Sequence, residues 1–292
     1  MQPTVWDRRK CHVGEGPVAT GSGHNKIFWV DILNNRVLWR ELITNESGEI
    51  GTTENVSFVL PRQNGGLVLG TAHGPLFWEV DGSTRMAPTR AEADGSSDPV
   101  PMRWNDAKVG PDGEIWMGTS SNGQETDRVG LHRISADGQS IERVLSGMKL
   151  SNGMDWSLDG RTFYLIDTGI LTLYAFDYQD GRISNQRVAM VFDPNTNEHP
   201  DGMAIDSEGC FWIAFWNGAC LRRYSPEFEL LETIDFPVRF LSSCAFAGPD
   251  LKTLVVTTAL GDNGWHDEHE LAGMTFIVET NVRGRASRVF DN

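Results

Sequence analysis

Short hydrophobic runs recur along the chain at nearly equal intervals, each following a group of turn residues. The runs occupy residues 27–30, 67–69, 115–117, 163–166, 211–214 and 254–256, so they begin about 40 to 48 residues apart. Turns such as 111–113 (Pro-Asp-Gly) and 158–160 (Leu-Asp-Gly) precede most of them, which is typical of strands joined by tight hairpins. Amphipathic helical periodicity is weak throughout. The pattern therefore predicts repeated β-structure with little helix.

Each repeat is long enough for about four strands. A second strand-like segment follows the run in several repeats, at residues 36–39, 76–79, 171–174 and 274–277. Repeats of this kind are typical of propeller blades, because one blade buries both of its faces only when its neighbours stack on it. We therefore expect an all-β fold, a six-bladed β-propeller with four-stranded antiparallel blades, formed by residues 1–292 as a single domain.

Closure of such a ring requires the two ends of the chain to meet. The extended segments 4–6 and 287–290 are the candidates, and we expect them to pair within one blade so that no sheet edge stays free. The dipeptide Trp-Asp occurs only at Trp6-Asp7, whereas a repeat array of the protein-docking type carries it in blade after blade. The sequence therefore disfavours a propeller that serves mainly to dock proteins.

The charge of the chain limits its partners. A formal net charge of −15 and a pI near 4.8 oppose binding to nucleic acids and to anionic membranes. No apolar run approaches the 18 residues of a membrane span, and the first residues do not resemble a secretory signal. We expect a cytoplasmic protein with a small ligand that is not polyanionic, and a monomer, because nothing in the sequence marks an interface.

Aligning the six repeats on their hydrophobic runs places a polar residue at the same position of every preceding strand, 10 to 12 residues before the run. These residues are Glu15, Ser57, Asn105, Asn152, Asp201 and Ser243. Equivalent positions on radially arranged blades converge near the axis. Two carboxylates and two carboxamides without His or Cys form an all-oxygen set, which suits Ca²⁺, Mg²⁺ or Mn²⁺ better than Zn²⁺. The sequence predicts one divalent metal site, with Ca²⁺ as the first choice.

A structural role is the alternative for these polar residues. Polar side chains next to glycine at strand starts often cap turns and bond to the backbone. Turn chemistry gives no reason for acids and amides to recur at one blade position, so we assign Glu15, Asn105, Asn152 and Asp201 to a site. Without a cation, Glu15 and Asp201 would repel each other in a partly buried channel. For the two serines we keep the structural interpretation.

Several ordered motifs carry a resemblance to a known family. They are Gly14-Glu15-Gly16-Pro17, Phe28-Trp29-Val30-Asp31-Ile32, Arg103-Trp104-Asn105-Asp106-Ala107-Lys108, Ser151-Asn152-Gly153-Met154-Asp155-Trp156-Ser157, Pro200-Asp201-Gly202-Met203 and Ser243-Cys244-Ala245-Phe246-Ala247-Gly248-Pro249-Asp250. The chain resembles the family of the senescence marker protein, regucalcin and gluconolactonase, which are sugar lactonases, over nearly its whole length. The resemblance implies a six-bladed propeller that hydrolyses a small-molecule sugar lactone.

The resemblance also implies roles for individual residues. Glu15, Asn152 and Asp201 would ligate the divalent cation, for which Zn²⁺, Mg²⁺ or Mn²⁺ are alternatives to Ca²⁺, and Asp201 would also act as the catalytic general base. Arg103 and Asn105 would bind the substrate. The blade alignment had already gathered the three ligands and Asn105, whereas Arg103 comes from the resemblance alone.

Other positions are less specific. A substrate-contacting glutamate of the family falls in a variable loop, where Glu125 is the candidate. The acids and histidines of residues 262–269 could indicate a second metal, but we interpret this segment as a solvated loop. Trp104 and Trp216 are candidates for an apolar surface against a sugar ring, although most tryptophans of a propeller pack between its blades.

Two other functions stay open. Related propellers hydrolyse phosphoesters at a similar calcium site, so a calcium-dependent phosphotriesterase-like hydrolase is the enzymatic alternative. A calcium-binding regulatory propeller without turnover is the other, and Arg103 beside Asn105 favours an enzyme over it. The sequence has neither a Gly-x-Ser-x-Gly nucleophile elbow nor a His-Glu-x-x-His zinc motif. Which sugar lactone would be hydrolysed does not follow from the sequence.

Overall fold

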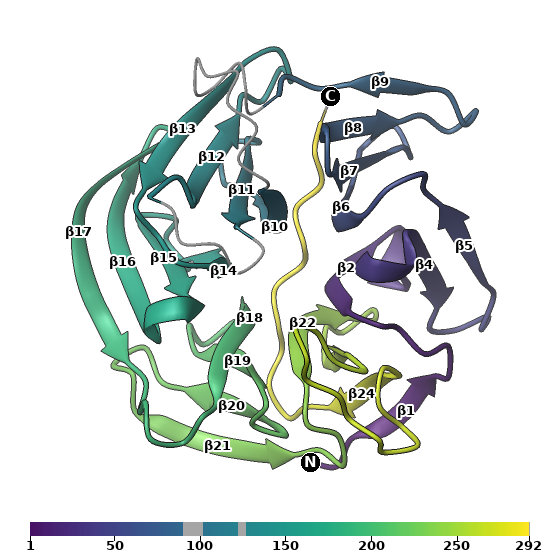
Figure 1. Cartoon of the computed structure of the whole chain (residues 1–292), viewed down its shortest axis with the longest axis vertical. Helices are drawn as coiled ribbons and strands as arrows, with labels where there is room; N and C mark the ends of the chain where they lie inside the picture. The colour runs from purple at the N-terminus through teal and green to yellow at the C-terminus, as the bar shows by residue number, and fades with distance from the viewer. Residues whose placement is uncertain (90–101, 122–126, 292) are drawn as a thin grey trace.

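A computed structural model describes residues 1–89, 102–121 and 127–291 of the chain. Six four-stranded antiparallel sheets surround a central axis, as Figure 1 shows. The predicted six-bladed β-propeller is therefore confirmed. Three 3-10 helices of three residues each are the helical elements of this described part: η1 (Ser22–His24), η2 (Ile32–Asn34) and η3 (Thr168–Ile170). No helix among the residues described here has the length and apolar character needed to cross a membrane.

The strands of each blade follow one another from the axis outward. The first strands, at the axis, are β2 (Gly14–Thr20), β6 (Val56–Pro61), β10 (Arg103–Val109), β14 (Ser151–Trp156), β18 (His199–Ile205) and β22 (Leu241–Ala247). The second strands are β3 (Lys26–Asp31), β7 (Leu67–Thr71), β11 (Ile115–Ser120), β15 (Thr162–Asp167), β19 (Phe211–Trp216) and β23 (Thr253–Thr258). These second strands contain the hydrophobic runs that define the repeat.

The two outer positions of each blade complete the sheets. The third strands are β4 (Arg36–Glu41), β8 (Gly74–Trp78), β12 (Gly130–Ile134), β16 (Thr172–Gln179), β20 (Cys220–Tyr224) and β24 (Thr275–Glu279). The outermost strands are β5 (Ser47–Gly51), β9 (Thr84–Met86), β13 (Ile141–Ser146), β17 (Arg182–Val191), β21 (Leu230–Asp235) and β1 (Thr4–Asp7). β1 comes from the start of the chain, so the last blade combines both ends of the sequence.

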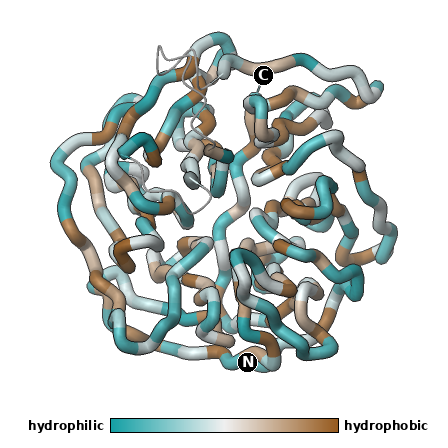
Figure 2. The backbone as a smooth tube through the Cα atoms, in the orientation of Figure 1, coloured by the Kyte–Doolittle hydropathy of each residue, from teal (hydrophilic) through white to brown (hydrophobic). Residues whose placement is uncertain are grey.

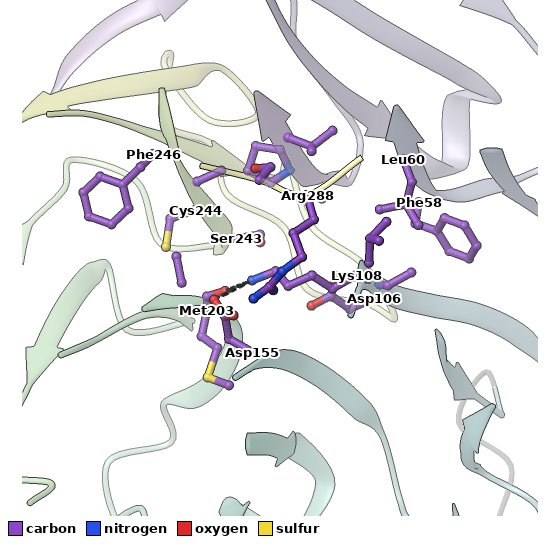
Figure 3. A pocket seen from close by; sticks show the side chains of 18 of the residues that line it. Phe58, Leu60, Asp106, Lys108, Asp155, Met203, Ser243, Cys244, Phe246 and Arg288 are labelled. Atoms are coloured by element: carbon purple, nitrogen blue, oxygen red, sulfur yellow. Dashed lines mark hydrogen bonds and ion pairs between the residues drawn. The ribbon is translucent and has the colours of Figure 1, made fainter. Parts of the chain in front are cut away.

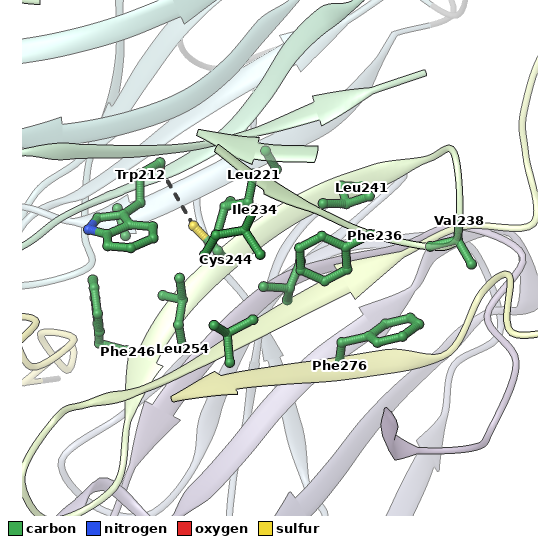
Figure 4. Close-up of a cluster of buried hydrophobic side chains, with 14 of the residues drawn as sticks. Trp212, Leu221, Ile234, Phe236, Val238, Leu241, Cys244, Phe246, Leu254 and Phe276 are labelled. Carbon is green, nitrogen blue, oxygen red and sulfur yellow. Dashed lines mark hydrogen bonds between the residues drawn. The ribbon is translucent and has the colours of Figure 1, made fainter. Parts of the chain in front are cut away.

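Hydrophobic side chains fill the spaces between neighbouring blades. Hydrophobic and hydrophilic positions alternate along many strands (Figure 2), as expected where the two faces of a strand have different surroundings. Between the blades of β19 and β22, the rings of Trp212 and Phe246 meet edge to face with centroids 6.0 Å apart, and Leu254 packs beside them (Figure 4). Large buried aromatic side chains of this kind hold the blades against one another.

The ring closes through β1, but not with the partner that we expected. Thr4 and Val5 pair with Ile277 and Phe276 of β24, so β1 covers the free edge of the last blade. The predicted pairing of residues 4–6 with 287–290 is wrong. After β24 the chain leaves its sheet and crosses the middle of the ring (Figure 1).

The crossing segment, residues 281–291, is here called the C-terminal strap. Its backbone contacts two blades near its start, because the amide of Ser207 donates to the carbonyl of Arg283 at 2.9 Å and the amide of Gly284 donates to the carbonyl of Leu251 at 2.7 Å. Gly284 is required there, since a Cβ atom would meet the Phe246 ring at 1.8 Å. The strap is therefore held against blades that lie before it in sequence.

The far end of the strap is anchored by Phe290. Its side chain is fully buried and stacks on Phe77, with ring centroids 5.9 Å apart. Its amide donates to the carbonyl of Pro61 at 2.9 Å, and its carbonyl accepts from the amide of Gln63 at 2.8 Å. The strap thus fastens the blade of β6 to blades elsewhere in the ring.

A small cavity of about 70 Å³ lies beneath the strap. Arg288 of the strap points into it, together with Lys108 of β10 (Figure 3). The Lys108 ammonium donates to the Asp155 carboxylate at 3.0 Å and to the carbonyl of Met203 at 3.2 Å. Arg285 of the strap donates to the carbonyl of Trp156 at 2.5 Å. Cationic side chains therefore gather at this end of the channel.

We expect Phe290→Ala to lower the free energy of unfolding by about 3 to 5 kcal/mol, the usual cost of removing a fully buried phenylalanine side chain. Equilibrium unfolding in urea measures this change. Leu231→Ala, on the exposed outer strand β21, is the control and should change the stability by less than about 0.5 kcal/mol. A loss at Phe290 no larger than at Leu231 would show that the strap does not hold the blades.

Candidate functional site

Every innermost strand has an irregularity of register at the same place in its blade. The register shifts lie between Glu15 and Val18, Val56 and Val59, Trp104 and Ala107, Ser151 and Met154, Pro200 and Met203, and Leu241 and Ser243. An irregularity of this kind bends a strand and changes the direction of its side chains. The six polar residues that were aligned from the sequence lie at or beside these shifts.

Five predicted residues line one cavity of about 680 Å³ at the axis. They are Glu15, Arg103, Asn105, Asn152 and Asp201. The structure therefore brings together all the described residues that we predicted for the site. Glu125, the remaining candidate, lies outside the described residues.

The two aligned serines do not belong to this cavity lining. Ser57 is buried, and Ser243 lines the smaller cavity beneath the strap. The structural interpretation chosen for them is consistent with these positions. The four aligned acids and amides therefore line the large cavity, and the two serines do not.

Glycines beside the polar residues allow neighbouring inner strands to approach closely. A Cβ atom on Gly153 would meet the carbonyl oxygen of Asp201 at 2.5 Å, and one on Gly202 would meet the hydroxyl of Ser243 at 2.1 Å. A larger residue at either place would push two blades apart. The local sequence around Asn152 and Asp201 thus sets how near the polar side chains come to the axis.

Burial shifts the protonation of the two acids. Burial raises the pKa of the Glu15 carboxyl to about 8, with a further contribution from the nearby Asp106 carboxylate. Burial also raises the pKa of Asp201 well above its ordinary value, and the charges of Glu15 and Asp106 add to this. The Oδ1 atom of Asp201 is buried and has no hydrogen-bond partner among the described residues. A negative site of this kind requires either protons or a cation.

A chain of hydrogen bonds orients Asn152. Its Nδ2 atom donates to the hydroxyl of Thr168 in η3 at 3.1 Å, and that hydroxyl donates to the carbonyl of Pro200 at 2.7 Å. The Oδ1 atom of Asn152 accepts from Nδ2 of Asn105 at 3.1 Å. Thr168 therefore fixes which way the Asn152 amide points. Nothing in the sequence pattern distinguished Thr168, because its partner Pro200 lies 32 residues away.

Arg103 enters the site through Asn105. Its Nη1 atom donates to Oδ1 of Asn105 at 2.5 Å and to the carbonyl of Trp104 at 3.2 Å. Burial lowers the pKa of the guanidinium, whereas the carboxylates of Asp262, Glu15 and Asp201 favour its charged form. Because an arginine guanidinium is not deprotonated in proteins, the group stays charged although burial lowers its pKa, and it keeps further N–H donors for a ligand.

Asn105 is occupied by protein partners on both sides of its amide. Besides Asn152, its Nδ2 atom donates to the carbonyl of Ser151 at 2.9 Å, and its Oδ1 atom accepts from Arg103. An amide nitrogen has two donors, and both are used here. Asn105 thus links Asn152, a candidate metal ligand, to Arg103, a candidate substrate-binding residue. Only its Oδ1 atom can accept a further hydrogen bond from a ligand.

The loop after β23 forms part of the cavity wall. Asp262, Asn263 and Trp265 line the cavity, while much of the segment is exposed, as the interpretation as a solvated loop expects. Of the two tryptophans considered from the sequence, Trp216 lines the cavity. Trp104 is buried in the core, edge to face with His132 at 5.2 Å between ring centroids.

The residues present fit a divalent cation. Glu15 and Asp201 supply carboxylate oxygens, and Asn152 supplies an amide oxygen that Thr168 holds in one orientation through the other end of the amide. Oxygen donors of this kind suit Ca²⁺, Mg²⁺ and Mn²⁺. A cation would pair with the buried, unpartnered oxygen of Asp201 and favour the charged form of both acids. These three residues are the candidates for holding a metal.

Comparison with known proteins agrees with this arrangement. Residues 13–260 match the family model described as "SMP-30/Gluconolactonase/LRE-like region". The regucalcin of Sus scrofa is 34% identical over 291 residues, covering 95% of this chain and 94% of that protein. The pentonolactonase of Haloferax volcanii is 32% identical over 283 residues, covering 94% of this chain and 93% of that protein.

A solved structure gives the same result for the fold. A protein named as calcium-binding regucalcin, from Agrobacterium tumefaciens, superposes with a TM-score of 0.89 at 21% identity, covering 99% of this chain and 97% of that one. At this identity the likeness shows a shared fold. The family match extends over most of the sequence, and curated relatives exceed 30% identity over nearly all of it. The chain therefore belongs to the SMP-30/gluconolactonase/LRE-like family.

Proposed function

We propose that the protein is a metal-dependent hydrolase that opens a sugar lactone to the corresponding sugar acid. The observation that carries the proposal is the meeting of two kinds of group at one cavity: two buried acids with an amide oxygen, and a charged arginine. A relative named pentonolactonase, similar over nearly the whole chain, supports this chemistry. An aldonolactone, the cyclic ester of a sugar acid, is the proposed substrate class.

Glu15, Asn152 and Asp201 would hold the metal, for which Ca²⁺ is the first choice. When bound, the ion supplies positive charge that stabilises the negative oxygen developing from the lactone carbonyl. Support for calcium comes from the oxygen donors themselves and from the structural neighbour named as a calcium-binding protein. The protein's contribution is to keep these donors converged and largely shielded from water.

Asp201 is the proposed general base. Its carboxylate takes a proton from the attacking water, whose oxygen then bonds to the carbonyl carbon. The bond from that carbon to the ring oxygen breaks, and the ring oxygen leaves with the proton that Asp201 accepted. Water is thereby added across the ester bond, and the product is an open hydroxy acid.

Arg103 is the proposed substrate-orienting residue. Its guanidinium presents several N–H donors from a planar group, which suits the oxygens of a lactone. Asn105 holds Arg103 and Asn152 together by the hydrogen bonds described above. Replacing Asn105 would therefore disturb the metal ligand Asn152 as well, so Arg103 is the cleaner position for separating substrate binding from metal binding.

A calcium-binding propeller without turnover is the second candidate. The neighbour named as a calcium-binding protein favours it. Such a protein needs the three ligands but has no use for a charged, substrate-orienting arginine beside them. The experiments below separate the two candidates.

The first test is proton release from a panel of aldonolactones, using protein stripped of metal and then supplied with Ca²⁺, Mg²⁺, Mn²⁺ or Zn²⁺. We expect metal-dependent hydrolysis, and a loss of at least about 100-fold in kcat in Asp201→Ala, the usual effect of removing a general base. Failure of every lactone and every metal to exceed the spontaneous rate would contradict the proposed function.

We expect Ca²⁺ to raise the melting temperature of chelator-treated protein more at pH 8 than at pH 6. Because burial raises the pKa of Glu15 to about 8, its protonated form stabilises the metal-free fold at low pH. That stabilisation is lost as the pH rises from about 4.5 through about 8, and a bound cation offsets the loss. At 100 times the Kd the gain is about 2.7 kcal/mol, or roughly 5 to 10 °C.

Thermal unfolding in matched buffers measures this shift. Asp201→Asn is the control, because it keeps the shape of the side chain and removes its charge. An equal shift in the wild type and in Asp201→Asn, at either pH, would place the cation elsewhere.

We expect Arg103→Met to lower kcat/KM for the best lactone by about 10- to 100-fold, which corresponds to losing hydrogen bonds from a charged donor. The affinity for Ca²⁺, measured by calorimetry, should stay within about threefold. Arg187→Met, on the exposed strand β17, removes a charge far from the cavity lining and should change neither quantity. If Arg103→Met left kcat/KM unchanged, the substrate-orienting role would be wrong.

A further inference from the structure

The loop between β23 and β24 contributes a wall to the cavity that the proposed mechanism does not use. Asp262 and Trp265 come from this loop and line the cavity together with Arg103. The Asp262 carboxylate is close enough to Arg103 to favour the charged form of the guanidinium. An acidic acceptor and an aromatic ring thus share one cavity with the proposed substrate-orienting arginine.

The loop is built to hold these two side chains in place. Gly261 has a φ of +145°, and a Cβ atom there would meet the carbonyl oxygen of Trp265 at 2.0 Å, so the loop folds tightly back on itself. The amide of Trp265 donates to the carbonyl of Asp262 at 2.9 Å. The buried carboxylate of Asp267 accepts from the amide of Arg239 at 2.7 Å. These contacts tie the loop to the segment before β22.

Trp265 belongs to an aromatic group at the cavity. Its ring meets Phe240 edge to face, with centroids 6.0 Å apart, and Phe240 stacks on Trp216 at 4.7 Å. The Arg239 guanidinium lies 6.0 Å from the centre of the Trp265 ring. Both tryptophans are partly exposed and line the cavity. They therefore offer apolar surface against which the C–H groups of a ring can pack.

Asp262 supplies a hydrogen-bond acceptor at the same wall. Its carboxylate accepts from the amide of Asn263 at 2.8 Å and from the side-chain Nδ2 of Asn263 at 3.1 Å. A carboxylate has about four acceptor positions, so two stay available to donors from a ligand. The hydroxyl groups of a sugar ring are such donors. A lactone without hydroxyl groups would offer no hydrogen-bond donor to the Asp262 carboxylate, so it would bind less well.

We propose that Asp262 and Trp265 are specificity-determining residues, which select a lactone ring that carries hydroxyl groups over a plain aliphatic lactone. The inference rests on the proposed lactonase function and goes beyond it, since the metal ligands and Arg103 act on the ester group that both kinds of lactone share. Trp265 packs against the ring carbons, and Asp262 accepts from ring hydroxyls.

The test compares kcat/KM for glucono-δ-lactone with kcat/KM for δ-valerolactone, which has the same ring without hydroxyl groups. In the wild type we expect a preference of at least 100-fold for gluconolactone. Trp265→Ala and Asp262→Asn should each lower this ratio by about 10-fold or more, mainly through gluconolactone, while the rate with δ-valerolactone stays within threefold. Trp265→Phe should keep part of the preference.

Glu268→Gln is the matched control for Asp262→Asn. It removes one negative charge from the same loop at an exposed position outside the cavity lining, and the ratio should stay at the wild-type value. A ratio near one in the wild type, or an unchanged ratio in both cavity variants, overturns the inference while leaving the lactonase function intact.

A binding measurement separates failure of the inference from failure of the proposed function. Saturation-transfer NMR with methyl β-D-glucopyranoside, which has no ester, reports contact of ring protons with the protein. We expect contact in the wild type and its loss in Trp265→Ala. Contact that depends on Trp265, without hydrolysis of any lactone, would support sugar binding at Trp265 and contradict the proposed lactonase function. No contact in the wild type, together with no preference for gluconolactone, would refute recognition of the sugar ring by Asp262 and Trp265.

Discussion

Six strands converge on one axis, and the close approach of their backbones determines much of the rest of the structure. Where two inner strands nearly touch, only a glycine fits, as Gly153 against Asp201 and Gly202 against Ser243 show. The same place in each inner strand has a shift of register, which turns the neighbouring side chains. Polar groups are thus placed at the axis by the packing of the blades, and need no separate loop to position them.

This convergence concentrates charges of both signs in two cavities along the channel. Glu15, Asp201 and Arg103 line the large cavity. Lys108, Arg285 and Arg288 line the small cavity beneath the C-terminal strap, together with Asp106 and Asp155. At the strap end the charges have fixed partners, since Lys108 is paired with Asp155. In the large cavity Arg103 favours the charged forms of Glu15 and Asp201, yet burial raises the pKa values of both acids. Two buried acids beside a single arginine leave the site with the capacity to bind a cation.

The sequence predicted what depends on local pattern or on repetition. The recurrence of hydrophobic runs gave the number of blades, and the register of the repeats brought Asn152 and Asp201 to one cavity. Contacts between distant segments were not predictable in this way. Thr168 orients Asn152 only because η3 places it beside Pro200, and a threonine after a strand has no distinctive pattern. Arg103 needed a family resemblance, because its residue type does not recur at that blade position.

The same reasoning explains why the two ends of the chain were misassigned. Extended, partly apolar segments at both termini were expected to pair, but a strand selects its partner by the edge that is free and by the fit of its side chains. β24 offered a free edge to β1, and Phe290 fitted against Phe77 in a blade far away in sequence. Trp265 was not singled out for a related reason: among 10 tryptophans, only the folded loop reveals that it lines the cavity together with Trp216. The inner strands thus carry the candidate metal ligands and Arg103, whereas the sequence of the loops at the channel mouth can change without disturbing the packing of the blades. In this fold, residues that recognise the rest of a substrate are therefore to be sought on the loops, where alignment of the repeats gives no information.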